Sequence, residues 1–233
     1  MYRQIDNLGY WNGRAATRTG DAIVAQPGQL DALVALERIG TRHSFSRNDE
    51  IYTEGGGSEV WYKVVSGTVR ICKLLADGRR HIAEFCFSGD SFGIDNTNER
   101  RYSAEAVDDV IVMRYQRRAT EQLVDRNPAL ARVLRDTVLR ELTAAQGRAL
   151  LLARMTAPER IATFLLEMCE RRDRTKFIDL PMSRNDIADY LGLTIETVCR
   201  ILSALKRAGA IAIACPHRIE LLDRAALEAM SET

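Results

Sequence analysis

The sequence lacks the features that mark membrane proteins and secreted, disulfide-linked proteins. No apolar run is long enough to span a membrane, and the polar N-terminus does not have the form of a signal peptide. The cysteines are scattered and none of them forms a CxxC pair, which favours reduced thiols over a disulfide framework. They are Cys72, Cys86, Cys169, Cys199 and Cys215. We therefore expect a cytoplasmic protein.

Motifs of the common catalytic and metal sites are absent too. His43, His81 and His217 are far apart in the sequence and lack the spacing of metal ligands. No serine lies in a nucleophile-elbow motif, and no glycine-rich loop matches a P-loop. We therefore expect no catalytic residue, no metal and no cofactor, and we predict that the protein is not an enzyme.

Neither sign of charge predominates. The chain has 33 Lys and Arg against 32 Asp and Glu, which leaves a formal net charge of +1. From Thr156 to the end, 11 basic residues face 12 acidic ones. Proteins that bind nucleic acids usually have a basic footprint, because they neutralise phosphates. A DNA-binding role would therefore require that basic side chains gather on one face, with the acidic ones turned away.

The most informative stretch is residues 180–209, which contains two short helix patterns. The first begins at Ser183, and Asp186 occupies the capping-box position three residues later. Gly192 supplies the backbone freedom that a tight turn needs, and Thr194 is a natural N-cap for the second helix. Two helices joined by so short a turn predict a helix-turn-helix, whose second helix enters the major groove of DNA.

Three residues at the start of the second helix are candidate readers of bases. Glu196 and Arg200 are four residues apart and so share one helix face. Arg hydrogen-bonds guanine and Glu accepts from cytosine, so this face could read both partners of a G·C pair. Ile195 has no hydrogen-bonding group and could contact a thymine methyl. The spacing alone leaves open that Glu196 and Arg200 are only a solvated pair.

Residues 186–211, DIADYLGLTIETVCRILSALKRAGAI, closely resemble the helix-turn-helix of the CRP/FNR regulators, and with Ile195 before Glu196 they are most similar to the FNR/FixK branch. The resemblance implies base contacts by Ile195, Glu196 and Arg200. It also implies a palindromic site with TTGA-like half-sites, and activation of transcription by contact with RNA polymerase. It further implies phosphate contacts by Ser183, Arg184, Thr194 and Thr197.

Two neighbouring features add to this interface. Residues 211–222 predict a hairpin, the wing of a winged helix, whose tip residues His217 and Arg218 could meet phosphates. Cys199 directly precedes Arg200, and a thiol near a helix N-terminus and cations is reactive. Oxidation there would place bulk and negative charge against the DNA, so Cys199 is a candidate for redox control. The alternative is a small residue that fits close to the backbone.

Upstream, a short helix pattern from about Leu30 to Ile39 precedes short β-rich segments in residues 43–115. Turn signals separate these segments, and Asp77-Gly78 is a strong hairpin signal. Closely spaced strands of this kind predict a small barrel or roll. Residues 62–69 resemble the opening hairpin of cyclic-nucleotide-binding rolls.

The residues that such rolls use to hold cAMP are missing. In cAMP-binding members a Glu contacts the ribose and an Arg directly before Ser-Ala contacts the phosphate; here these positions hold Ile94 and Tyr102. Arg101 is one residue away, and in a strand it would point to the opposite face. FNR-type oxygen sensors carry N-terminal cysteines, whereas the first cysteine here is Cys72. We therefore expect DNA binding without a small-molecule effector.

A long helix is predicted to begin near Pro128 and to end at about Met155. Its apolar and small residues recur at spacings of four and three, which is close to a coiled-coil repeat. A helix of about 25 residues spans about 38 Å, more than a small roll can cover. We therefore expect a parallel homodimer; packing on the chain's own roll is the alternative. The seam residues are Val138, Leu142, Ala145, Ala149 and Leu152.

The predicted fold is therefore α+β. It comprises a flexible arm (1–28), a cyclic-nucleotide-binding-like β-roll (29–127), a dimerisation helix (128–155) and a winged helix-turn-helix (156–233). The predicted function is a homodimeric, sequence-specific transcription regulator that binds double-stranded DNA. The alternative is a module that senses a nucleotide or another small ligand and acts through protein contacts.

Overall fold

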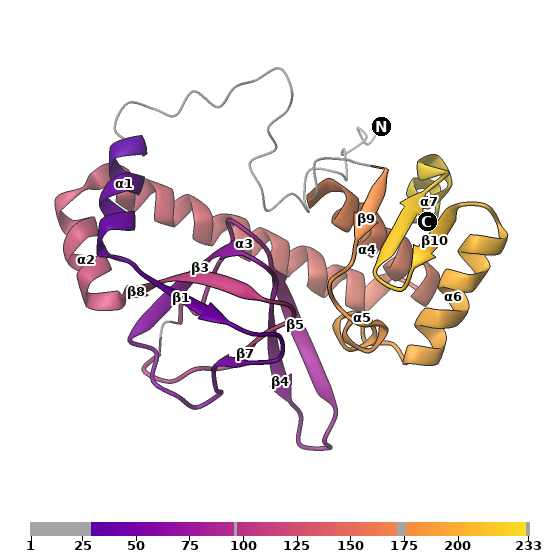
Figure 1. Ribbon diagram of the computed structural model, residues 1–233, viewed down its shortest axis with the longest axis horizontal. Helices are drawn as coiled ribbons and strands as arrows, with labels where there is room; N and C mark the ends of the chain where they lie inside the picture. The colour runs from indigo at the N-terminus through magenta and orange to yellow at the C-terminus, as the bar shows by residue number, and fades with distance from the viewer. Residues whose placement is uncertain (1–28, 96, 172–175, 232–233) are drawn as a thin grey trace. The chain divides into compact units, whose positions relative to one another are not determined.

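The computed structural model describes residues 29–95, 97–171 and 176–231 (Figure 1). The predicted N-terminal arm, residues 1–28, lies outside the described part of the chain. The described residues form two compact units, and the division falls inside the long helix α3 (Pro128–Arg154), between Arg135 and Asp136. Across these residues no helix combines the length and the apolar composition needed to cross a membrane.

The N-terminal unit contains two four-stranded antiparallel sheets that together make the predicted roll. One sheet has the strand order β1 (Thr41–Phe45), β8 (Val110–Gln116), β3 (Val60–Ser66), β6 (Ser91–Phe92). The other has the order β2 (Glu50–Tyr52), β7 (Ser103–Ala106), β4 (Val69–Leu74), β5 (Arg80–Cys86). Side chains alternate along each strand, so every second residue faces inward. The core of the roll therefore draws buried residues from both sheets, such as Val64, Val112, Ile71 and Ala104.

Local turn chemistry accounts for part of this topology. Strands β4 and β5 form the hairpin expected at Asp77-Gly78, and Gly78 has a φ of 83° in the left-handed region that glycine tolerates. Strands β1, β6 and β7 are short or largely polar and carry only a weak local signal. They exist because each pairs with a stronger strand, namely β8, β3 and β4.

A second core cluster lies where three helical segments cover one end of the roll. Helices α1 (Gln29–Ile39) and α2 (Arg117–Arg126), with the first turn of α3, pack around Trp61 and Tyr115. The two rings stack with centroids 4.3 Å apart, and the Trp61 indole donates to the Thr120 hydroxyl at 3.0 Å. This hydrogen bond satisfies the only polar atom of a buried indole.

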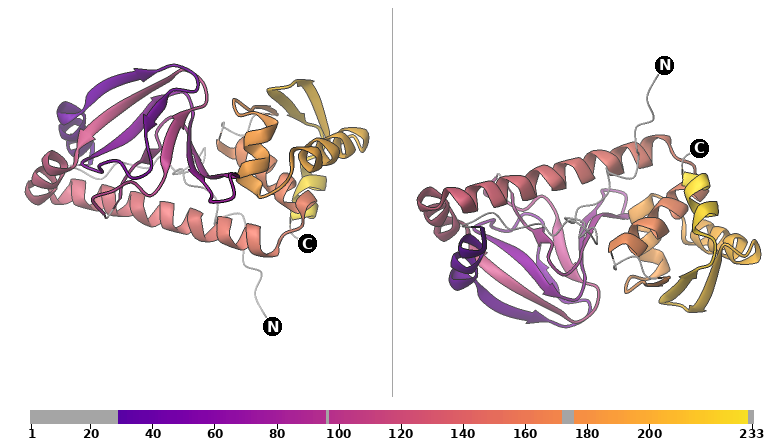
Figure 2. Two further views of the ribbon diagram at one scale, coloured as in Figure 1. Left: turned by 90° about the horizontal axis from the view of Figure 1, so that it is seen from below. Right: turned by 90° about the horizontal axis from the view of Figure 1, so that it is seen from above.

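The C-terminal unit follows the predicted winged helix-turn-helix pattern (Figures 1 and 2). After the second part of α3 come α4 (Ala157–Arg171), β9 (Phe177–Asp179), α5 (Arg184–Leu191), α6 (Ile195–Arg207), β10 (Ile211–Cys215), β11 (Arg218–Leu221) and α7 (Arg224–Ser231). The three strands form one antiparallel sheet in the order β10, β11, β9. Phe164, Ile178, Leu191 and Val198 are among the fully buried side chains of this unit. The fold is the predicted α+β combination of β-roll, long helix and winged helix-turn-helix.

Candidate nucleic-acid interface

The first helix of the helix-turn-helix, α5, begins at the predicted capping box. The Ser183 hydroxyl accepts from the Asp186 backbone N–H at 3.1 Å, and the Asp186 carboxylate accepts from the Ser183 N–H at 3.0 Å. Each bond satisfies a backbone donor that a helix N-terminus leaves without an intrahelical partner. Asp186 is buried, so this cap also holds the start of α5 in the core.

The turn between the two helices depends on one left-handed residue. Gly192 is the C-cap of α5, with φ 64° and ψ 40°, a conformation that favours glycine. Two residues later Thr194 caps α6, and its hydroxyl accepts from the Thr197 N–H at 3.3 Å. Val198, Ile201, Leu202 and Leu205 face the core from α6. The caps and the apolar stripe together determine which face of α6 remains exposed.

That exposed face carries the residues predicted to read bases. Ile195, Glu196 and Arg200 are all exposed, and Ile195 retains 38% of its surface although it is apolar. A backbone N–H at the start of α6 and the Thr194 hydroxyl hydrogen-bond the Glu196 carboxylate and lower its pKa. Glu196 is therefore an ionised acceptor at neutral pH, which is the form that a cytosine amino group would require.

The four helix residues predicted to touch phosphates differ in accessibility. The Thr194 hydroxyl lies at the exposed start of α6, 3.2 Å from the Thr197 hydroxyl. Ser183 is half-buried, and its hydroxyl is already committed to the capping box. Arg184 is half-buried as well, and burial lowers the pKa of its guanidinium, although nearby Cys199 opposes this shift. Its Nη1 atom is buried and has no hydrogen-bond partner among the described residues.

The tip of the wing lies where the sequence predicts it, with Pro216 and His217 between β10 and β11. His217 is tied down, since its Nδ1 lies 3.0 Å from the Leu180 carbonyl oxygen. Arg218 extends over the Phe177 ring at 4.8 Å and pairs with Asp179 at 3.6 Å. Its side chain nevertheless keeps half of its surface exposed, so the guanidinium is held in a fixed position and remains accessible.

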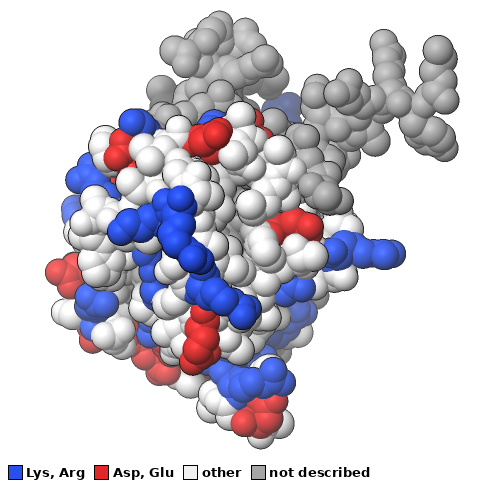
Figure 3. All heavy atoms as spheres, turned by 90° about the vertical axis from the view of Figure 1, so that its right-hand side faces the viewer, with Lys and Arg blue, Asp and Glu red and all other residues white. Residues whose placement is uncertain are grey.

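The net charge from Thr156 to the end of the chain is near zero, but several basic side chains lie together on the face that carries α6 (Figure 3). Figure 3 shows the side of the molecule that carries α6, where Lys and Arg side chains form a band with a few Asp and Glu among them. Arg200, Lys206 and Arg207 are exposed on α6 and form no ion pair within the described ranges. Two acidic residues are engaged within the unit: Asp186 is buried in its cap, and Glu170 forms an ion pair with Arg224 at 2.8 Å.

The predicted dimer seam on α3 is largely uncovered in the single chain. Val138 and Leu142 are 47% and 53% exposed, and Ala145 and Ala149 are also exposed. Leu152 differs, because it is half-buried and its Cδ2 lies 3.8 Å from where a Cβ on Gly192 would be. Leu139 and Leu150 are not among the predicted seam residues, yet they are 52% and 62% exposed. Each directly follows a seam residue, Val138 or Ala149, and so lies about 100° further round the helix, which is why the spacing of four and three does not include it.

The roll contains a cation that the sequence analysis did not consider. Arg100 is 2% exposed, and its Nη1 donates to the Gly93 carbonyl at 2.5 Å and to the Asp95 carboxylate at 3.0 Å. Its Nη2 donates to the Val60 carbonyl, and its guanidinium lies 4.2 Å from the centroid of the Tyr52 ring. This cation therefore ties the loop after β6 to β3 from inside the roll.

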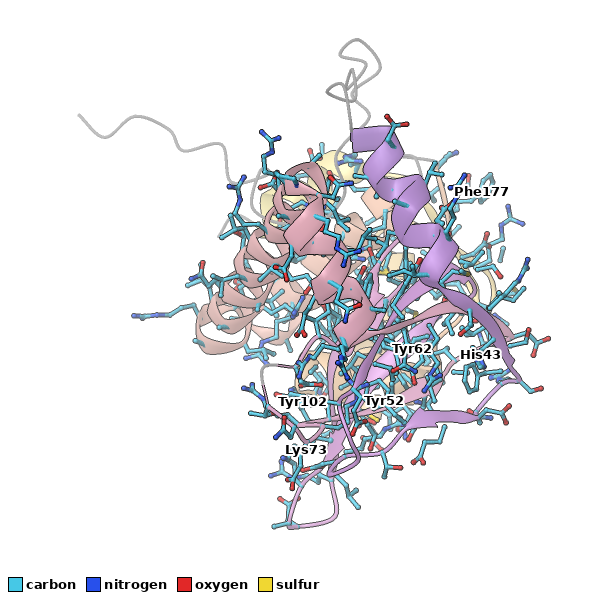
Figure 4. The ribbon with its side chains drawn as sticks, turned by 90° about the vertical axis from the view of Figure 1, so that its left-hand side faces the viewer. His43, Tyr52, Tyr62, Lys73, Tyr102 and Phe177 are labelled. Atoms are coloured by element: carbon cyan, nitrogen blue, oxygen red, sulfur yellow. The ribbon has the colours of Figure 1, made fainter. Side chains whose placement is uncertain are left out.

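The predicted strand position of the neighbouring Arg101 is wrong. This residue was assigned to a strand, but β7 begins only at Ser103, and Arg101 is exposed in the bend before it. The side chain that turns inward is Arg100, one position earlier. Tyr102 is half-buried and packs against the core of the roll, close to Tyr52 and Tyr62 in Figure 4. The Arg100 side chain has no local sequence signal, because its acceptor on β3 is brought near it only in the folded roll.

The thiols fall into two groups. Cys199 and Cys215 are exposed, on α6 and at the end of β10, whereas the other three are buried. Burial is also the main reason why the pKa of the Cys72 thiol rises to about 12, with the Glu105 carboxylate adding to the shift. Cys199 therefore lies accessible beside Arg200, as expected for a residue near the reading face.

A winged helix-turn-helix with an exposed recognition helix, joined by one long helix to a β-roll, defines a DNA-binding regulator of transcription. Residues 159–230 match the model of the Crp-like helix-turn-helix domain, and residues 42–127 match that of the cyclic nucleotide-binding domain. The chain belongs to the CRP/FNR family of transcription regulators, in its FixK-like branch.

Individual relatives support this assignment over most of the chain. The nitrogen fixation regulation protein FixK of Azorhizobium caulinodans is 43% identical over 208 residues, which are 87% of this chain and 82% of that protein. FixK of Bradyrhizobium diazoefficiens is 38% identical over 233 residues, 97% and 96% of the two chains. The structure of FixK2 from Bradyrhizobium japonicum has a TM-score of 0.79 and 42% identity, covering 82% of this chain and 97% of that one. Both FixK proteins are named as regulators of nitrogen fixation.

Proposed function

We propose that this protein acts as a homodimer that reads a palindromic DNA site with TTGA-like half-sites. The observation that carries the proposal is the exposed start of α6, where Ile195, Glu196 and Arg200 project from a helix whose other face is buried. Two such helices, about 34 Å apart in a dimer, would enter successive major grooves on one side of the duplex.

Each half-site is read by a complementary set of groups. The Arg200 guanidinium donates to guanine O6 and N7, and the Glu196 carboxylate accepts from a cytosine amino group. The lowered pKa of Glu196 supports this role, since the residue stays an acceptor throughout the neutral range. Ile195 contributes apolar contact with a neighbouring thymine methyl, which accounts for an exposed isoleucine at the start of the helix.

Phosphate contacts flank this reading face and fix its register. Thr194 and Thr197 lie at the N-terminus of α6, where the helix dipole also favours an anion. At the wing, Arg218 is held in an accessible position by Phe177 and Asp179, and His217 lies beside it. Ser183 and Arg184 contribute least, because the first is committed to its cap and the second is half-buried.

The dimer forms through α3, as a parallel pair of helices. An apolar stripe is exposed along α3 in the single chain, including Val138, Leu139, Leu142 and Leu150. Side chains of this kind are unfavourable in water and would be buried against the same stripe of a second copy. Ala145 and Ala149 lie along the stripe and allow the two backbones to approach closely.

DNA binding requires no small effector in this proposal. The roll lacks the Glu and the Arg that cAMP-binding members use, and its interior holds the Arg100–Asp95 pair instead. Control then comes from the amount of protein or from the Cys199 thiol, which is exposed next to Arg200. The FixK resemblance adds activation of transcription by contact with RNA polymerase, in the cytoplasm.

The proposal is tested by titrating a duplex that carries a TTGA palindrome, at one fixed salt concentration. Arg200→Ala should weaken binding by about 1–3 kcal/mol per half-site and relax the preference for guanine at one position. Lys206→Ala is the matched control, because it removes an exposed cation further along the same helix. It should weaken binding to all sequences alike. If wild-type protein does not distinguish the palindrome from random DNA, the protein acts instead through the alternative, ligand-sensing route.

A further inference from the structure

We propose that Arg160 is the positioning residue that fixes the helix-turn-helix relative to α3, and thereby sets the spacing between half-sites that the dimer accepts. Arg160 lies in the first turn of α4, directly after the bend at Met155 and Thr156 that ends α3. All three nitrogens of its guanidinium donate to backbone carbonyl oxygens.

Those carbonyls belong to the C-terminal ends of two different helices. Nη2 donates to Leu152 in the last turn of α3, and Nε donates to Met155 just beyond it, both at 2.9 Å. Nη1 donates to Leu191, the last residue of α5, also at 2.9 Å. The final carbonyls of a helix have no intrahelical donor and carry the negative end of the helix dipole. One cation therefore caps two helices, and its bond to the second reaches a carbonyl 31 residues further along the chain.

This arrangement gives the joint a defined angle. Only two residues, Met155 and Thr156, separate α3 from α4, and a two-residue link alone could adopt several conformations. The Arg160 guanidinium is planar and directs its donors in fixed directions, so it holds both helix ends at once. Gly192 adjoins the same point, since a Cβ there would lie 3.5 Å from Nη1. The turn of the helix-turn-helix is thereby tied to the end of α3.

The consequence for DNA follows from the proposed dimer, on which this inference rests. If α3 holds the two copies together, the angle at Arg160 determines how far apart the two α6 helices lie. One added base pair moves a half-site by about 3.4 Å along the axis and rotates it, so a rigid joint rejects altered spacings. Arg160 touches no base and would act only through this geometry.

The experiment compares duplexes with one half-site, with the preferred spacer, and with spacers changed by one or two base pairs. Two linked sites gain roughly 10²-fold over one when the geometry fits. Arg160→Gln should bind the single half-site within about twofold of wild type but lose about tenfold on the preferred palindrome, because the loosened joint forfeits part of that gain. Its ratio of affinities between preferred and altered spacers should fall towards one.

Arg154→Gln is the matched control, because it removes the same charge from an exposed position at the end of α3. It should keep the spacing preference. Arg160→Lys serves as the second variant if Arg160→Gln does not fold. The three donors of its ammonium radiate from one nitrogen and do not reproduce the planar fork whose three nitrogens reach separate carbonyls, so it should also lose the preference. A folded Arg160 variant of either kind with the wild-type spacing ratio would overturn the positioning role. Wild-type protein with no preference for the palindrome over one half-site would instead overturn the proposed dimeric function.

Discussion

Replacing Arg100 by methionine should destabilise the β-roll severely, although the residue is far in sequence from the reading helix. Arg100→Met keeps much of the side-chain volume but removes the cation that faces Asp95 and two backbone carbonyls. Breaking a buried ion pair by removing one partner costs about 3–5 kcal/mol, because the other charge is left uncompensated. The Asp95 side chain keeps 17% of its surface exposed, so water can relieve part of this cost. We therefore expect a loss near the lower end, about 3 kcal/mol.

Urea unfolding followed by tryptophan fluorescence measures this loss of unfolding free energy in the N-terminal unit, which contains the roll. The chain has two tryptophans, and Trp61 lies buried in the roll against Tyr115. In a Trp11→Phe background the fluorescence therefore reports on the roll alone. The exposed neighbour gives the control, because Arg101→Met removes the same charge and should change stability by about 0.5 kcal/mol or less.

A double-mutant cycle separates the ion pair from other effects of the substitution. Adding Asp95→Asn to Arg100→Met removes the stranded carboxylate, so the double variant should be more stable than the sum of the single losses predicts, by about 1 kcal/mol or more. A loss below about 1 kcal/mol for Arg100→Met, or strictly additive losses in the cycle, would refute the view that this pair holds the loop closed.

Two further predictions concern the surface of the protein. Ala149→Glu places a charge on the exposed stripe of α3 and should shift sedimentation at micromolar concentration from dimer to monomer. A wild-type protein that is already monomeric would contradict the seam. Titration of the native protein with a thiol reagent should modify the two exposed cysteines rapidly and the three buried cysteines only on unfolding. The buried thiols include Cys72, whose pKa is raised to about 12. A third cysteine that reacts rapidly in the native protein would contradict this burial.

Local chemistry explains why the reading helix could be found from the sequence. The capping box at Ser183, the left-handed Gly192 and the Thr194 cap each act within about four residues. Apolar spacing then decides which face of α6 is buried and which is free to carry Glu196 and Arg200. The same reasoning located the β4–β5 hairpin through Asp77-Gly78.

Contacts between distant segments were decided only by the tertiary structure. Arg100 and Arg160 are two of many arginines in the sequence, and neither has a local pattern that distinguishes it. Arg100 is buried because Val60, on a strand 40 residues away, supplies one of its acceptors, and Arg160 bonds a carbonyl 31 residues further on. Strands β1, β6 and β7 likewise depend on their neighbours. Caps and helix stripes are encoded by adjacent residues, whereas burying a long charged side chain becomes favourable only when the folded chain brings its acceptors together.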